Sequence, residues 1–238
     1  MRFMVMHKVD ARLEAGELPA DGIIENMGQL IGRSLKEKIF LDGAGLHRGA
    51  TRARVKLEGG GRRTVERGPY AEASNELVAG FAHVIATSIE HAIDLAADLG
   101  AAAGDRELEV GPVVEAWDLT GKPRPADAPY RFLLLRKADA AYEAGTRPLA
   151  PAARDLLAAW KRDGILMSEV SLAPSSTAAR SRLRAGKRSW TDGPFTESKE
   201  LVGGFSILEV PSLADAKRFA DEYADILGDN EVDIRVVA

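Results

Sequence analysis

The sequence predicts an α+β fold made of two copies of one unit, and three observations support this prediction. The stretch Arg2–Pro19, RFMVMHKVDARLEAGELP, aligns without a gap with Arg131–Pro148, RFLLLRKADAAYEAGTRP, and nine of the 18 positions are identical. A second stretch, RGPYAEASNELVAGF at 67–81, matches DGPFTESKELVGGF at 192–205 at eight of 14 positions when Ser74 is treated as an insertion. Between the copies lies DLTGKPRPADAP, which has the composition of an exposed linker. We therefore expect repeats over 1–117 and 130–238, joined by a linker over 118–129.

Each repeat is predicted to begin with a strand and a helix. Short continuous apolar runs, typical of a strand buried on both faces, occur at Phe3–Met6 and Phe132–Leu135. A helix follows because apolar residues recur at helical spacing. These residues are Ile23, Met27, Leu30 and Ile31 in the first repeat, and Ala153, Leu156, Leu157 and Trp160 in the second.

Three further strands, a second helix and a last strand complete each repeat. Two strand-like segments come next, at 41–47 and 53–57 in the first repeat and at 165–172 and 181–183 in the second. Gly59-Gly60-Gly61 and Ala185-Gly186-Lys187 are predicted hairpin tips. Apolar strands follow at 77–86 and 201–210, and a hydroxyl with a carboxylate three residues later predicts helix starts at 87–90 and 212–215. The closing strands are expected at 108–114 and 232–237.

The order β-α-β-β-β-α-β is a ferredoxin-like plan, in which both helices cover one face of an antiparallel sheet. The first and fourth strands of each repeat are apolar on both sides, so the second face of each sheet also needs cover. We therefore predict that the two repeats pack sheet to sheet and bury these faces within one chain.

The repeated motif resembles a known family. DGPFTESKELVGGF, together with RFMVMHKVD at the start and LDGAGLHRG after the first helix, is similar to the YCII-related family, also called DGPF-domain proteins. The resemblance implies ferredoxin-like units that form a dimeric α/β barrel, here within one chain. It brings no established reaction. Family members are often encoded beside extracytoplasmic-function sigma factors, and some carry a His-Asp pair in a cleft. The first repeat departs from the motif at Arg67 and Tyr70.

Composition limits the expected partners. The 238 residues carry 32 basic and 36 acidic side chains, well mixed, so we expect no direct nucleic-acid ligand. The chain has no cysteine, which excludes disulfides and thiolate sites and fits a reducing cytoplasm. The opening segment is too short and too charged for a signal peptide, and no stretch reaches membrane-spanning length. We expect a soluble cytoplasmic protein with no membrane partner.

His47 and Asp192 are the candidate catalytic residues. Asp192 opens the motif of the second repeat only, and His47 occurs in the first repeat only, where the second has Ala173. We hypothesise that a twofold arrangement brings them together in one composite cleft, where the carboxylate orients the imidazole. The alternative is structural: Asp192 forms an Asx turn and His47 is a solvated loop residue.

Other polar residues have two interpretations each. His83 stands among apolar strand residues, so it faces either a cavity or the core. Lys8 and Lys137 recur at strand ends, where they line a pocket or are simply solvated. Gly203-Gly204 suggests a bulge or the close approach of another backbone. No spacing resembles a zinc, P-loop or dinucleotide motif, so we predict no metal and no cofactor.

These observations lead to one preferred function and two alternatives. The preferred function is binding of a small polar organic molecule in a cleft between the repeats, with cofactor-free acid-base catalysis as the reaction to test. One alternative is a non-catalytic accessory or sensor module that acts with a sigma factor. The other is a purely structural assembly. Exposed sheet edges also favour a homodimer.

Overall fold

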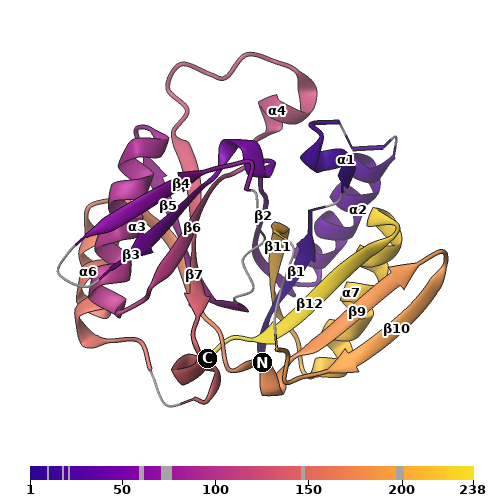
Figure 1. Cartoon of the computed structure of the whole chain (residues 1–238). Coiled ribbons are helices and arrows are strands. Elements are labelled where there is room, and N and C mark those ends of the chain that lie inside the picture. The colour runs from indigo at the N-terminus through magenta and orange to yellow at the C-terminus, as the bar shows by residue number, and fades with distance from the viewer. Residues whose placement is uncertain are drawn as a thin grey trace. The chain divides into compact units, whose positions relative to one another are not determined.

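The structure is a computed structural model that describes residues 1–9, 11–17, 19–20, 22–58, 62–70, 77–145, 148–196 and 201–238. It contains two antiparallel six-stranded sheets, each in a compact unit with its own helices (Figure 1). Unit 1 holds Met1–Arg48, Leu172–Thr196 and 201–238, and unit 2 holds Gly49–Ser171. Within the described residues, no helix is long and apolar enough to cross a membrane.

Unit 1 is a sheet with the strand order β10-β9-β12-β1-β11-β2. Its central strand, β1 (Arg2–Lys8), pairs with β11 (Val202–Glu209) and β12 (Asn230–Val236), and β2 (Phe40–Gly45) forms one edge. The hairpin of β9 (Ala179–Arg184) and β10 (Lys187–Asp192) forms the other edge. Its helical segments are α1 (Ala11–Glu14), α2 (Ile23–Lys36), η3 (Ser175–Thr177) and α7 (Leu213–Leu227).

Unit 2 has the same plan, with the strand order β4-β3-β6-β7-β5-β8. Here β7 (Tyr130–Ala138) is central and pairs with β5 (Leu77–Ala86) and β6 (Glu107–Pro112). The hairpin of β3 (Ala53–Leu57) and β4 (Arg63–Arg67) forms one edge and β8 (Leu166–Ser171) the other. Its helical segments are η1 (Gly49–Thr51), α3 (Ile89–Ala103), α4 (Ala116–Thr120), α5 (Ala140–Glu143) and α6 (Pro151–Arg162).

The compact units do not coincide with the sequence repeats predicted at 1–117 and 130–238. Each unit takes its first strand, first long helix and an edge strand from one repeat, and its hairpin, second long helix and remaining strands from the other. The chain passes from one unit to the other at Arg48–Gly49 and at Ser171–Leu172. These are equivalent places in the two repeats, directly after β2 and β8.

One face of each sheet is buried against the unit's long helices. In unit 1, Phe3, Val5, Val232 and Ile234 pack with residues of α7 such as Phe219. In unit 2, strand residues pack with α3 and α6 in the same way, among them Val110, Leu134, Leu99 and Trp160. Because side chains alternate along a strand, the residues between these core positions point to the other side of the sheet. We call that side the second face of each unit.

Most predicted elements are confirmed at the level of the single strand or helix. Ser88 and Ser212 cap α3 and α7, each accepting a hydrogen bond from a backbone N–H three residues later. Ala185 and Gly186 form the predicted tip between β9 and β10. The tip predicted at Gly59-Gly60-Gly61 lies outside the described residues. The predicted strand at 41–47 ends at Gly45, so His47 follows it.

Candidate functional site

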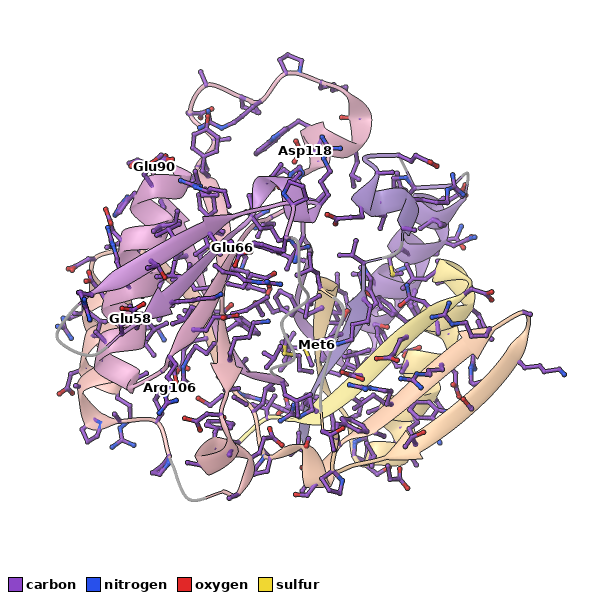
Figure 2. The ribbon with its side chains drawn as sticks, in the orientation of Figure 1. Met6, Glu58, Glu66, Glu90, Arg106 and Asp118 are labelled. Atoms are coloured by element: carbon purple, nitrogen blue, oxygen red, sulfur yellow. The ribbon has the colours of Figure 1, made fainter. Side chains whose placement is uncertain are left out.

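The second face of unit 1 carries a buried ionic cluster. Val232 and Ile234 of β12 point into the core, so Asp233 between them points to the second face. Its carboxylate lies 3.2 Å from Lys8 Nζ and accepts two hydrogen bonds from Arg180, at 2.6 Å from Nε and 3.0 Å from Nη2. Lys8 is 3% exposed, and Asp233 and Arg180 are also buried. Figure 2 shows the side chains of the chain, with Met6 marking β1.

The ions in this cluster stabilise one another. Burial alone would raise the pKa of Asp233, but the positive charges of Lys8 and Arg180 and their hydrogen bonds lower it below its ordinary value. The carboxylate is therefore ionised at neutral pH. Arg180 also pairs with Glu231, at 3.2 Å, and its guanidinium lies 4.2 Å from the ring centre of Phe195. Phe195 is the aromatic residue of the DGPF motif, so the motif contributes directly to the cluster.

Unit 2 has a cluster of the same design around Glu109. This carboxylate is 0% exposed, accepts a hydrogen bond from Arg52 at 2.8 Å, and lies 3.6 Å from Lys137 Nζ. Arg54, on the neighbouring strand, places its guanidinium 3.7 Å from the ring centre of Tyr70. Burial would raise the pKa of Glu109, but Lys137, Arg52 and Arg54 lower it, so this carboxylate is also ionised. Figure 2 marks β4 of this unit by Glu66.

The two clusters correspond at four positions and differ at a fifth, because Ala178 stands in unit 1 where unit 2 has Arg52. Lys8 and Lys137, Asp233 and Glu109, Arg180 and Arg54, and Phe195 and Tyr70 occupy equivalent places in the two repeats. In each unit, the lysine comes from one sequence repeat and the carboxylate and arginine come from the other. The interpretation of Lys8 and Lys137 as solvated strand ends is wrong, because both are buried against carboxylates.

His7 lies on the opposite side of β1 from this cluster, toward α7. Its Nδ1 is 2.6 Å from the hydroxyl oxygen of Tyr223, and both residues are buried. A Cβ atom at Gly203 or Gly204 would lie 2.7 or 2.6 Å from the His7 ring, so the two glycines make room for it. A register shift between His7 and Lys8 marks the bulge predicted at Gly203-Gly204. Burial raises the pKa of Tyr223, which therefore stays protonated and can donate this hydrogen bond.

The structure does not bring the predicted pair His47 and Asp192 together. Asp192 ends β10, and its row across the sheet runs through Ala179, Ile234, Val5 and Ser206 to Gly43. Five strand spacings separate Asp192 from Gly43, a distance on the order of 24 Å. His47 follows Gly43 along the chain, at this opposite edge of the sheet. The Asp192 side chain is 78% exposed and pairs with Lys217 at 3.1 Å, and His47 is half-buried.

The remaining candidates are His83 and possible metal ligands. His83 is buried in β5, on the second face of unit 2, between β7 and β8. No group of three or more potential metal-ligating side chains occurs among the described residues.

Sequence reasoning missed Asp233, Glu109, Arg180 and Arg54. The available signal was a charged residue inside a predicted strand, such as Arg54 in ARVKL and Asp233 in NEVDIRV.

Known proteins add one relationship. A search among curated proteins finds no match for this chain. A scan against protein-family models matches residues 130–227, which run from β7 to the end of α7 and therefore contribute strands to both units. The matching model is that of the YCII-related domain, so this part of the chain carries a YCII-related domain.

Proposed function

We propose that the protein binds a small polar organic molecule at the buried Lys–carboxylate–Arg clusters, and that cofactor-free acid-base chemistry is the reaction to test there. Each cluster combines residues of both sequence repeats. The strand order β12-β1-β11-β2 of unit 1, repeated as β6-β7-β5-β8 in unit 2, supports the ferredoxin-like plan. The packing of the sheets as a barrel stays a prediction from the sequence.

One observation carries this proposal: each unit buries a lysine, a carboxylate and arginine together, although burying charges costs desolvation free energy. Burying an ion pair costs desolvation energy, and well-packed apolar residues in its place are often as stable or more stable. A purely structural sheet would therefore not need Lys8 with Asp233, or Lys137 with Glu109. Buried titratable groups held in a charged state are typical of functional sites.

The chemistry of the cluster suits ligands with oxygen acceptors. The lysine and arginine side chains carry several N–H donors, and the ionised carboxylate holds them in place. Donors arranged in this way also stabilise negative charge on an oxygen when a neighbouring carbon loses a proton. Because His47 and Asp192 lie apart, we propose the clusters rather than that pair as the site. The sigma-factor accessory role stays a prediction from the sequence.

Binding by the full-length protein tests the proposal. Calorimetry with acetate, pyruvate and benzoate, with the neutral amides acetamide and benzamide, and with ethylamine should show preferential binding of the oxygen-rich ligands. Lys8→Met and Lys137→Met should each weaken binding about tenfold or more, because each removes a charged donor. Asp233 and Glu109 keep an arginine partner in these variants, so the fold should persist.

The exposed Lys161 of α6 provides the matched control, since Lys161→Met removes the same charge outside both clusters. Equal binding by all three lysine variants, or no binding of any ligand by the wild-type protein, would contradict the proposal.

A further inference from the structure

The aromatic position is one of the places at which the two ionic clusters differ, and this difference concerns a hydroxyl group. Tyr70 of unit 2 and Phe195 of unit 1 occupy the same place in the repeated motif, and each ring lies over the guanidinium of its cluster. We infer that the cluster of unit 2 is specialised to bind a small organic acid through the Tyr70 hydroxyl, whereas unit 1 lacks this contact. This inference rests on the proposed function of the clusters.

The Tyr70 hydroxyl is buried without a hydrogen-bond partner among the residues that the structure describes. Buried hydroxyl groups are nearly always hydrogen-bonded, because an unmade bond costs free energy. The ring is fixed by Arg54, whose guanidinium lies 3.7 Å from its centre. The hydroxyl is therefore held in place beside the cluster and has no hydrogen-bond partner in the described part of the chain, which is the arrangement expected of a group that contacts a ligand.

The surroundings of this hydroxyl decide the class of ligand. Arg52, Arg54 and Lys137, the cations around Glu109, offer only N–H donors. Burial, and next the charge of Glu109, raise the pKa of Tyr70, so the phenol keeps its proton and is a donor as well. The three cations outnumber the two carboxylates near the hydroxyl, Glu109 and Glu66, so the net charge is positive and suits a ligand that presents acceptor oxygens and negative charge. A carboxylate satisfies both conditions.

At two positions unit 1 has a hydrocarbon side chain where unit 2 has a hydrogen-bonding one. Phe195 has no hydroxyl, and Ile207 stands where unit 2 has the buried His83 on the second face. Both of the differences therefore replace a hydrogen-bonding side chain of unit 2 by a hydrocarbon in unit 1.

Removing the Tyr70 hydroxyl in the full-length protein tests the inference. Tyr70→Phe should weaken the binding of acetate, pyruvate or benzoate by about tenfold or more, the effect expected for losing a hydrogen bond to a charged group. Tyr130→Phe, which removes the hydroxyl of an exposed tyrosine outside both clusters, should leave that affinity unchanged. Tyr70→Phe should also leave the melting temperature of the free protein unchanged or raise it, because the hydroxyl has no described partner to lose.

The two proposals fail in different ways. If wild-type protein binds none of the acids, both the proposed function and the role of Tyr70 are wrong. If wild-type and Tyr70→Phe bind an acid equally while Lys137→Met binds it more weakly, the role of Tyr70 alone is wrong. A lower melting temperature of Tyr70→Phe with unchanged affinity would assign the hydroxyl a structural role and would also overturn the inference.

Discussion

Glu109 shows how neighbouring cations keep a buried carboxylate ionised. Its carboxylate is inaccessible to solvent, and an isolated charge in that environment would be neutralised by a proton. Lys137, Arg52 and Arg54 prevent this, because their positive charges favour the ionised form. In turn, Glu109 compensates the charge of cations that are themselves buried. Its removal leaves these cations without their carboxylate, and the loss should be on the order of 3 kcal/mol.

The lowered pKa of Glu109 gives the loss a defined pH dependence. A group whose folded-state pKa is below its unfolded value, about 4.3 for glutamate, contributes stability above that value and loses it as the pH falls toward the folded pKa. Wild-type protein should therefore be more stable than Glu109→Gln in urea denaturation at pH 7, and the difference should shrink below about pH 4. In acid, both proteins carry a neutral side chain at this position.

The exposed residue Glu58 provides the control, because Glu58→Gln should change the free energy of unfolding little at any pH. A difference between wild type and Glu109→Gln that stays constant from pH 7 to pH 3 would show that the pKa of Glu109 is the same in the folded and the unfolded protein, so that the cations do not lower it.

At the scale of the element, the long helices α2 and α3 each contain a glycine, but the space around the two glycines differs. Gly28 lies inside α2, and a Cβ atom there would meet nothing within 4 Å. Gly100 lies inside α3, where a Cβ would lie 2.4 Å from a Leu57 methyl carbon and 2.5 Å from one of Leu108. α3 therefore approaches β3 and β6 closely because it has glycine at this position, whereas α2 has no such contact at Gly28.

The same substitution should therefore have opposite effects in these helices. Gly28→Ala should raise the free energy of unfolding by about 0.5–1 kcal/mol, because alanine has the higher helix propensity. Gly100→Ala gains the same propensity but should lower stability by about 1–3 kcal/mol, because Leu57 and Leu108 must move. Thermal unfolding followed by circular dichroism measures both. Equal shifts in the same direction would mean that helix propensity alone decides.

Local elements could be predicted from the sequence, and their partners could not. The apolar run at Phe3–Met6 and the cap of α7 at Ser212 are local signals, and both are confirmed, whereas the cap of α3 is Ser88, one residue after Thr87, the hydroxyl that the spacing to Glu90 predicts. The burial of Lys8 depends on Asp233, at the far end of the chain, so no local pattern reveals it. Likewise, the segments at 77–81 and 201–205 share the pattern LVxGF, so the sequence does not show that β1 pairs with β11.

At the scale of the whole molecule, the exchange of segments makes each unit depend on both halves of the chain. The central strand β1 of unit 1 pairs with β11 and β12, and the central strand β7 of unit 2 pairs with β5 and β6. Neither half of the sequence therefore contains a complete six-stranded sheet. The match to the YCII-related domain at residues 130–227 likewise covers parts of both units.

This dependence predicts what happens when the chain is cut between the halves. A protease site inserted at 122–127, between α4 and β7, should yield two fragments on a denaturing gel. Under native conditions the fragments should stay together at the mass of the intact 25.6 kDa chain, because each central strand remains hydrogen-bonded on both sides to strands of the other fragment. Size-exclusion chromatography with light scattering measures this mass, and urea should separate the fragments. Two native species of half the mass, each with its own cooperative unfolding transition, would show instead that each half of the chain folds independently of the other.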